Sequence, residues 1–487
     1  MMEEKKSNST DTKSLDGSQE DPVLVNEASP IINLKKMVRK VDYIVLPIMM
    51  ITYCMQFMDK LALSSGSVYG VKTDLHLVGQ EYSWCSSIFY FGFILGNFIT
   101  ARILHVVPLG KLIFTAVFFW SITLACSAAS QNYAGLMVAR FFLGFCESFV
   151  SPVFVFMTTM WWTQKQSALR TNIYFAGNDI GGAVSSLITF GLGQAGGSLN
   201  PWRYLFICYG CLAFVWSFVI LFFLPDSPAK ARFLNPSEKK YYKEEMSTSK
   251  IEKKWDWEQA KSCATDINVW LILFSIATSI LPNSGVISYG YIILDSFGFT
   301  SAESALINFA LSVFTWFCIT FSGYLASRFK NSRCYVILGV VVFSLVGGCL
   351  IYKGQSKGVK LLGYFLVDVQ PAITPLVLGM TAANFKGNTR RSVVNSAVFI
   401  VYCACNIGGP QLFKSNDAPH YPHAFLSWII CYCLNACLAV IMRFSWIRSN
   451  RKMEKLAESA TISEVKSTVS EDEEIMEFKD PTFRYKY

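Results

Sequence analysis

Twelve apolar runs constrain this chain more than any other feature of its sequence. Each is close to the length that a helix needs to cross a bilayer, about 17–25 residues. A polar stretch divides the runs into two sets of six, which predicts an all-α polytopic membrane protein with twelve transmembrane helices in two six-helix halves. The runs lie near residues 44–64, 82–104, 109–129, 133–158, 171–193 and 202–224, and near 268–294, 302–325, 335–352, 360–383, 392–413 and 422–446.

The amino-acid composition is typical of an integral membrane protein. Only 16% of the residues are charged and 52% are hydrophobic, whereas a soluble chain carries about 25% charged residues. The net charge of +9 comes from Lys and Arg in short loops, so it indicates topology and no nucleic-acid partner. We expect a disordered cytoplasmic tail at 1–41, a first half at 42–224, a cytoplasmic loop at 225–267, a second half at 268–446 and a cytoplasmic tail at 447–487.

The sequence contains no signature of an enzyme. It has no Walker-type loop, no GxSxG and no HExxH, so we expect no enzymatic activity, no cofactor and no metal site. The 15 cysteines are scattered through apolar runs and are interpreted as small buried residues. The acidic stretch from Ser470 to Glu474 could be phosphorylated or could simply be a solvated tail.

Two opposite charges lie inside the fourth apolar run. Arg140 and Glu147 are separated by almost two helical turns, so they share one face about 10 Å apart along the axis. A charge in the bilayer interior is normally turned inward and used for function. The pair could alternatively do no more than join helices.

A second pair of charges lies near the outer end of the first run. Lys60 and Arg140 reach a similar depth, and two cations in the outer half of a cavity would suit an anionic substrate. Asp59 could neutralise Lys60, although Asp59 and Lys60 could instead meet the lipid headgroups. Glu147 in apolar surroundings could take up a proton near neutral pH, and Arg140 would oppose this until substrate occupied it.

Polar residues beside glycine or proline mark three further helices. Asn178 lies in a glycine-rich part of helix 5, Asn283 follows Pro282 in helix 7, and Asn406 precedes Pro410 in helix 11. Interruptions in helices 7 and 11 would free backbone groups to face a cavity, and interrupted helices point to a midplane substrate site. We therefore expect all three asparagines to contact substrate, with Asp368 and Gln370 in helix 10 as further candidates.

Several motifs resemble the major facilitator superfamily, specifically the fungal anion:cation symporters typified by allantoate permease. The resemblance implies proton-driven uptake of a small organic anion, with Arg140 engaging substrate, Glu147 taking part in proton coupling and Lys60 as the basic residue of helix 1. Relatives carry allantoate or ureidosuccinate, nicotinate, pantothenate, biotin, cysteine, sulfonates or small peptides. The motifs include Phe57-Met-Asp-Lys60, Tyr82-Ser-Trp84, Arg140-Phe-Phe-Leu-Gly144 with Glu147, Pro201-Trp-Arg203, Gly387-Asn-Thr-Arg-Arg391 and Asn406-Ile-Gly-Gly-Pro-Gln411.

The chain departs from the family pattern in the loop between helices 2 and 3. Val106 stands where a basic residue is usual, which would loosen one gating contact, while Lys111 remains. Arg328 and Arg333 keep the equivalent loop of the second half basic. These three cations are the expected gating residues.

We therefore expect a monomeric proton symporter of the plasma membrane that imports a small carboxylate by alternating access. Asp59 is the second candidate for proton coupling after Glu147. A neutral-solute carrier or exporter of the same fold, and a nutrient sensor with little transport, remain alternatives.

Overall fold

The computed structural model describes residues 33–104, 106–194, 197–244, 255–459, 476–477 and 483–487. The regular secondary structure of these residues is entirely helical. The helices that build the bundle are α1 (Leu34–Ser67), α3 (Glu81–Ile103), α4 (Leu109–Ser127), α5 (Tyr133–Glu147), α6 (Val150–Trp161), α7 (Gln164–Phe175), α8 (Gly177–Gly193), α9 (Pro201–Phe223), α12 (Ile267–Ser296), α13 (Ser301–Arg328), α14 (Arg333–Lys353), α15 (Lys357–Val367), α16 (Ile373–Asn384), α17 (Asn388–Gln411) and α18 (Pro422–Ser459). Shorter helices are α2 (Val71–Asp74), α10 (Pro236–Glu244) and α11 (Trp257–Thr265).

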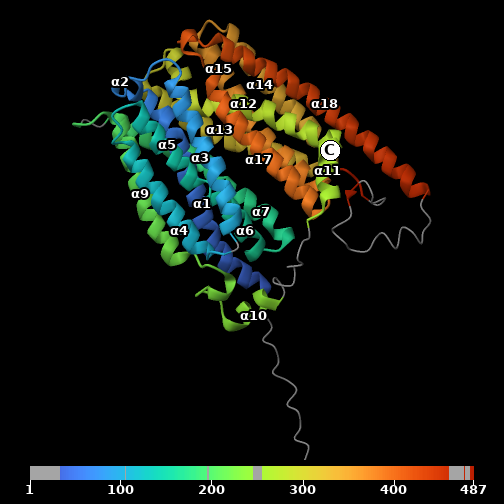
Figure 1. The fold of residues 1–487 in the computed structure, drawn as a ribbon. Coiled ribbons are helices and arrows are strands. Elements are labelled where there is room, and N and C mark those ends of the chain that lie inside the picture. Colours follow the sequence, from blue (N-terminus) through green and yellow to red (C-terminus); the bar gives the residue numbers. More distant parts are fainter. Residues whose placement is uncertain (1–32, 105, 195–196, 245–254, 460–475, 478–482) are drawn as a thin grey trace, which may run out of the picture.

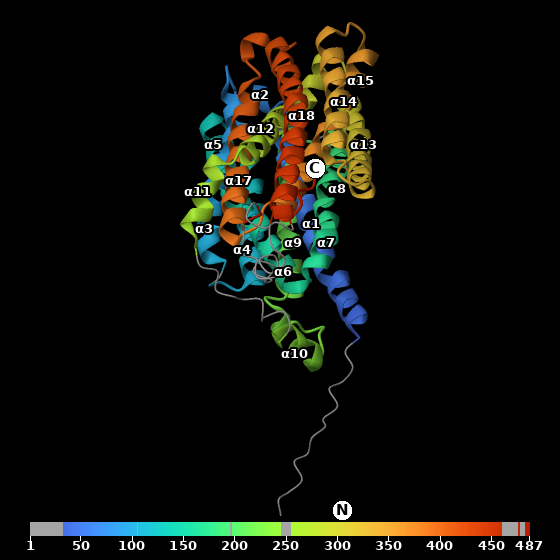
Figure 2. The same cartoon turned by 90° about the vertical axis from the view of Figure 1, so that its right-hand side faces the viewer.

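The helices form two halves of six, as the apolar runs predict. The first half contains α1 to α9, with α5–α6 and α7–α8 each forming one transmembrane helix, and the second contains α12 to α18, with α15–α16 forming one (Figures 1 and 2). By length and composition, 11 helices of the described residues could cross a membrane. The twelfth, α7–α8, is polar at its start and rich in glycine, which explains why apolarity alone does not select it.

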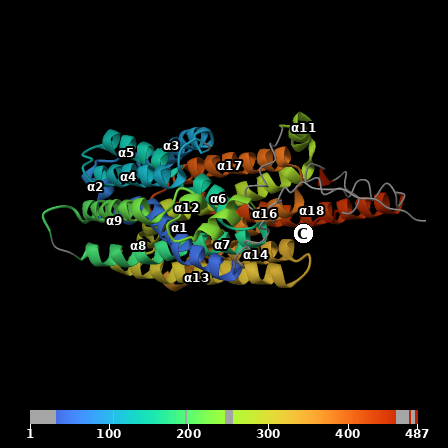
Figure 3. The ribbon, with the colours of Figure 1, turned by 90° about the horizontal axis from the view of Figure 1, so that it is seen from below.

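The bundle has two ends, which differ in what they carry. We call the end of the bundle where α1 begins and α18 ends the terminal face, and the other end the opposite face. Figure 3 shows the same bundle from below, turned by 90° from Figure 1. The linker helix α10 joins the terminal face of the first half, where Glu238 pairs with Lys40 at 2.8 Å. The second linker helix, α11, packs beside α17 in the second half.

Helices continue into both expected tails. Residues 34–41, expected in the N-terminal tail, form the start of α1, where the Asn33 side chain accepts a hydrogen bond from the Lys36 amide at 3.1 Å. Residues 447–459, expected in the C-terminal tail, continue α18. An apolar run ends where the chain meets water. The helix itself can continue beyond that point, because its backbone hydrogen bonds are made within the helix and do not depend on apolar side chains. Residues 1–32 and the stretch from Ser470 to Glu474 lie outside the described residues.

The predicted interruption of helices 7 and 11 is wrong. α12 continues through Pro282, and α17 continues to Gln411 with Pro410 in its last turn. Instead, the two helices cross closely here: a Cβ on Gly409 would lie 2.7 Å from the Leu281 carbonyl oxygen. The Ser284 hydroxyl, 3.2 Å from the Cys405 carbonyl oxygen, donates to it across the crossing. Glycine thus allows two unbroken helices to pack, rather than opening either one.

A second close crossing holds the fourth helix in place. α3 and α5 pack with their backbones nearly in contact, because a Cβ on Gly144 would lie 1.9 Å from the Phe89 carbonyl oxygen and one on Gly92 would lie 2.0 Å from the Phe141 carbonyl oxygen. Small residues at a membrane helix crossing permit this approach. The crossing fixes the depth and rotation of α5, which carries both Arg140 and Glu147.

We expect Gly144→Ala to destabilise the protein, because the new methyl group meets backbone that cannot move aside. Overpacking of this kind costs about 1–3 kcal/mol. Gly339→Ala is the matched control, since a Cβ at Gly339 meets nothing within 4 Å. Thermal unfolding of the detergent-purified variants should show a lowered midpoint for Gly144→Ala alone, and equal midpoints for the two variants would contradict the assignment.

Candidate functional site

Four charged side chains of the first half come together inside the bundle. Asp59 and Lys60 are on α1, and Arg140 and Glu147 are on α5. Arg140 is 3% exposed, Asp59 1% and Glu147 0%, while Lys60 is half-buried. Electrostatic interactions link Glu147 to Lys60, Arg140 and Asp59. The sequence predicted the members of this cluster, and the structure brings them together.

The arginine and the glutamate of this cluster lack hydrogen-bonding partners. Arg140 has no partner for Nε and Nη1, and Glu147 has none for either carboxylate oxygen, among the described residues. No ion pair joins these two side chains in the described part of the chain. Leaving a buried polar group without a partner costs about 1–3 kcal/mol, and more for a charged one. The buried atoms of these two groups therefore carry a cost that no hydrogen bond within the described residues offsets.

The other two charges of the cluster are placed differently. Asp59 accepts a hydrogen bond from the indole Nε1 of Trp120, which lies on α4. Lys60 lies with its Nζ 5.9 Å from the centre of the Phe93 ring and interacts electrostatically with Cys403 on α17. Lys60 therefore faces the second half across the interface between the halves, rather than the lipid headgroups.

Two acidic residues lie where the fourth helix of each half changes its hydrogen bonding. Glu147 is the last residue of α5 and α6 starts at Val150, but Ser148 and Phe149 between them keep right-handed helical dihedral angles. In the second half, α15 ends directly before Asp368, and a short 3-10 helix, Gln370–Ala372, precedes α16. The Thr315 hydroxyl donates to the Asp368 carboxylate. Both nevertheless run on as membrane-length helices, Tyr133–Trp161 and Lys357–Asn384.

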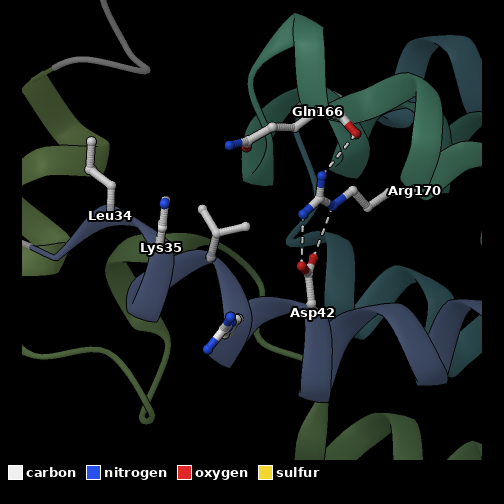
Figure 4. Close-up of a pocket in the computed structure, with 7 residues that line it drawn as sticks. Leu34, Lys35, Asp42, Gln166 and Arg170 are labelled. Carbon is white, nitrogen blue, oxygen red and sulfur yellow. Dashed lines mark hydrogen bonds and ion pairs between the residues drawn. The ribbon is translucent and has the colours of Figure 1, made fainter.

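An internal repeat relates the two halves. At the terminal face of the first half Asp42 pairs with Arg170 at 2.8 Å, beside a pocket of about 320 Å³ (Figure 4). Asp266 pairs with Arg390 in the second half. Asp59 and Asn283 each follow the aspartate of their own half by 17 residues. Asn283 therefore takes the position of Asp59 in the repeat, so the first half offers charges where the second offers an amide.

The three predicted asparagines are not joined to the charged cluster by any hydrogen bond in the described residues. Asn178 and Asn283 are half-buried. Asn406 is 2% exposed, and its side-chain amide donates to the Tyr402 carbonyl at 2.8 Å. Their contact with substrate stays a prediction.

The three predicted gating cations all lie at the terminal face. Lys111 is exposed, and its backbone amide donates to Asp226 at 3.3 Å. Arg328 is exposed beside the Phe329 ring, and Arg333 donates to the Gly379 carbonyl at 2.9 Å. All of these contacts stay within one half, so the gating role also stays a prediction.

Hydrogen bonds between the halves are found near the opposite face. The Tyr82 hydroxyl donates to the Ser288 carbonyl at 2.8 Å, and the hydroxyls of Ser83 and Tyr289 are 2.6 Å apart. Six such bonds join described residues of the two halves, and all six lie toward this face. The other four are Ser87 hydroxyl to Ile407 carbonyl at 2.7 Å, Gln411 amide to Ser87 hydroxyl at 3.0 Å, Tyr291 amide to Ser64 hydroxyl at 3.4 Å and Ser301 hydroxyl to Val68 carbonyl at 3.3 Å.

These hydroxyl residues were missed as functional residues, although Tyr82 and Ser83 belong to a motif that the sequence analysis noted. They are ordinary in an apolar run, and only the pairing of α3 with α12 and α17 gives them partners. A hint was present in the serines and tyrosines gathered at the outer ends of helices 2 and 7. Their bonds close the opposite face in this conformation.

One lysine lies between the halves at this face, outside the membrane-spanning segments. Lys72 lies on α2 with its Nζ 4.5 Å from the centre of the Tyr82 ring and 5.6 Å from that of Tyr289. Burial lowers the pKa of the Lys72 ammonium to about 8, against the opposing attraction of Asp295. The charged lysine is thus held between the halves at a cost.

Comparison with known proteins gives a consistent result. Residues 49–410 match the family model described as Major Facilitator Superfamily. Allantoate permease of Saccharomyces cerevisiae is 30% identical over 475 residues, which cover 93% of this chain and 86% of the relative. An uncharacterized transporter of Schizosaccharomyces pombe is 30% identical over 462 residues, covering 93% and 87%. The thiamine pathway transporter of S. cerevisiae is 27% identical over 429 residues, covering 86% and 81%.

Solved structures share the fold. A bacterial homolog of the human lysosomal transporter Spinster, in an inward-facing and unoccupied conformation, superposes with a TM-score of 0.65 at 13% identity, covering 85% of this chain and 98% of that one. A D-xylose–proton symporter gives a TM-score of 0.63 at 14% identity, covering 82% and 96%. At these identities the likeness concerns the fold alone.

Closure of the opposite face should strengthen as the pH rises above about 8. An exposed lysine has a pKa of about 10.4, so between the two values the open state holds a proton on Lys72 that the closed state releases. By linkage, raising the pH through this window favours the closed state. Spin labels at Val78→Cys and Gln355→Cys, exposed positions of the two halves, would report the separation in a background without other accessible cysteines.

The variant Lys72→Met supplies the control for this titration. Because it removes the buried charge, it should show the closed distance already at neutral pH and lose the dependence above pH 8. A pH response of the same size in Lys72→Met would show that another group is responsible.

Proposed function

Because the chain belongs to the major facilitator superfamily, in a branch that includes allantoate permease, we propose that this membrane transporter is a proton-coupled symporter that imports a small organic anion. The observation that carries the proposal is the buried, unpartnered pair of Arg140 and Glu147 beside Lys60. A family of transporters accounts for the fold, and this cluster accounts for the chemistry. The chain is not an enzyme, since its relatives are transporters.

The substrate step is supported by the donors that Arg140 leaves unused. A guanidinium presents a rigid fork that matches a carboxylate, and charge-assisted bonds of this kind are about twice as strong as neutral ones. Lys60, on the neighbouring helix and facing the second half, would add a second cation. An incoming carboxylate would thus satisfy Nε and Nη1 of Arg140 and offset the cost of their burial.

The proton step is supported by Glu147, whose two carboxylate oxygens are also unused. While Arg140 holds no substrate, its charge stabilises the ionised carboxylate. When an anion occupies Arg140, that stabilisation falls, and Glu147 can take up a proton. Substrate and proton would then travel together. Asp59, which is already bonded to Trp120, is the second candidate for this role.

The transport step is supported by the asymmetry between the two faces. We place the termini and the linker in the cytoplasm, so the face closed by Tyr82, Ser83 and their partners would be the outer one. Substrate would leave through the terminal face in this conformation. Rocking of the halves about the cluster would break these bonds and open the outer side, as in other transporters built from repeats.

Arg140→Lys should reduce uptake about tenfold or more while leaving surface expression intact, because it keeps the charge and loses the fork. Cells lacking endogenous carriers, offered labelled allantoate, nicotinate, pantothenate, cysteine or dipeptides, provide the assay. Arg451→Lys is the control, because Arg451 is exposed near the end of α18. Uptake near the unmutated level in Arg140→Lys would remove this residue from the binding site.

The same assay discriminates the alternatives. A carboxylate substrate should compete for uptake much better than its neutral amide, since the amide cannot offset the charges of Lys60 and Arg140. Equal competition would favour a neutral-solute carrier. Export from loaded vesicles, or signalling without uptake, would favour an exporter or a nutrient sensor.

Glu147→Gln should separate exchange from accumulation. A permanently neutral side chain imitates the protonated form, so counterflow should continue while pH-driven accumulation is lost. Glu147→Asp should keep part of the activity with a shifted pH optimum. Reconstitution in liposomes allows both measurements, with Asp59→Asn as the parallel variant. If Glu147→Gln still accumulates substrate under an imposed pH difference and Asp59→Asn does not, coupling belongs to Asp59.

A further inference from the structure

The end of the chain returns to the second half and docks there. The Tyr485 ring is 6% exposed, and its centre lies 4.8 Å from that of Trp446 on α18. One side chain on α18, Asn450, holds the backbone of the same tyrosine: the Tyr485 amide donates to Asn450 Oδ1 at 2.8 Å, and Asn450 Nδ2 donates to the Tyr485 carbonyl at 3.0 Å. A tyrosine near the chain end thus occupies a fitted position.

A second asparagine holds the next residue in the same manner. The Lys486 amide donates to Asn384 Oδ1 at 2.8 Å, and Asn384 Nδ2 donates to the Lys486 carbonyl at 2.8 Å. Two successive residues therefore have both backbone groups satisfied by side chains of α16 and α18. Pairing of this kind recognises an extended peptide, because it uses the main chain for affinity and leaves the side chains to give specificity.

Aromatic rings on either side extend the contact. The Phe483 ring lies 5.1 Å from Lys386 Nζ, and the Tyr487 ring lies 5.0 Å from the Arg443 guanidinium carbon. Cation–π contacts of this length are attractive. The docked segment thus presents three aromatic rings to a basic and aromatic surface of the second half.

An acidic residue of the segment enters a buried ion cluster. Glu477 is 0% exposed, pairs with Arg390 at 2.8 Å and accepts a hydrogen bond from the Lys386 amide at 3.0 Å. Arg390 in turn pairs with Asp266 at the start of α12 and donates to Ser262 on α11 at 2.6 Å. The cluster therefore joins four parts of the molecule: the linker helix α11, the start of α12, the start of α17 and the docked segment that contains Glu477.

The internal repeat shows what is particular about this cluster. The equivalent pair in the first half, Asp42–Arg170, is completed by Trp162 of that same half, whose indole Nε1 donates to Asp42 at 2.8 Å. In the second half the additional partner comes from the far end of the chain.

We propose that α11, α16, α17 and α18 form a peptide-binding site on the terminal face of the second half, and that its ligand is the chain's own aromatic and acidic segment, of which residues 476–477 and 483–487 are seen docked. Occupancy of the site fixes the linker helix α11 against α17, so the docked segment is a clamp on the connection between the halves. This site is separate from the charged cluster of the first half and does not depend on what the transporter carries.

The direct test is binding in trans. A variant that ends at residue 475 is purified in detergent and titrated with a fluorescent synthetic peptide of residues 476–487. We expect saturable binding, a raised unfolding midpoint and slower hydrogen exchange in residues 257–265 of α11. A peptide with Tyr485→Ala should bind about tenfold more weakly, in keeping with the loss of one buried aromatic contact. A Lys486→Ala peptide should bind as the unmodified one, because the contacts found for Lys486 use its backbone.

Full-length variants keep the proposal testable if the shortened chain does not fold. Glu477→Gln and Tyr485→Ala should each accelerate exchange in α11, with Lys486→Ala as the control. The readout needs no transport substrate, so failure of the proposed anion transport would leave it unaffected. Unchanged α11 exchange in both variants, or equal binding of the Tyr485→Ala and unmodified peptides, would overturn the proposal.

Discussion

Burial of two opposite charges that do not pair with each other is the constraint on which the rest of this molecule depends. A charge in the bilayer interior is costly unless it is compensated, and in the described residues no hydrogen bond reaches Nε or Nη1 of Arg140. The Arg140 guanidinium lies 5.8 Å from the centre of the Phe89 ring, and the charges of Lys60 and Arg140 act on Glu147. The close crossing of α3 and α5 keeps the two groups at this depth.

The two halves answer this constraint in different ways. Parts of their frameworks repeat: in each half, an aspartate in or directly before the first helix pairs with an arginine of the fifth helix. Their centres do not repeat, since Asp59 of one half becomes Asn283 in the other. The charged residues of the first half would bind the charge of a substrate, and the amide of the second half would be available to bond to the substrate's other polar groups.

The sequence predicts the helices and the charged cluster for the same physical reason. Apolar runs and isolated charges are easy to recognise in a sequence, because a charged residue inside the bilayer is costly and therefore rare. Local backbone geometry is less predictable: Pro282 and Pro410 suggest breaks, yet α12 continues through Pro282 and α17 continues to Gln411. The Tyr82–Ser288 bond and the docking of Tyr485 depend on residues more than 30 positions apart. The spacing of apolar residues along a helix does not predict contacts between residues so far apart in the sequence.

Closure of the opposite face by hydroxyl and backbone groups suits a transporter that must open again. Each neutral hydrogen bond contributes about 0.5–1.5 kcal/mol net, so six of them together favour the closed arrangement by about 3–9 kcal/mol. Reversing a strongly biased two-state equilibrium needs about 5.5 kcal/mol of differential binding. Charge-assisted bonds to a buried arginine, worth about 1.5–3 kcal/mol each, lie in the same range. The hydrogen bonds of the opposite face and the bonds that a ligand would make to Arg140 are therefore of comparable magnitude, so a ligand that bonded to Arg140 in only one conformation would shift the balance between the two faces.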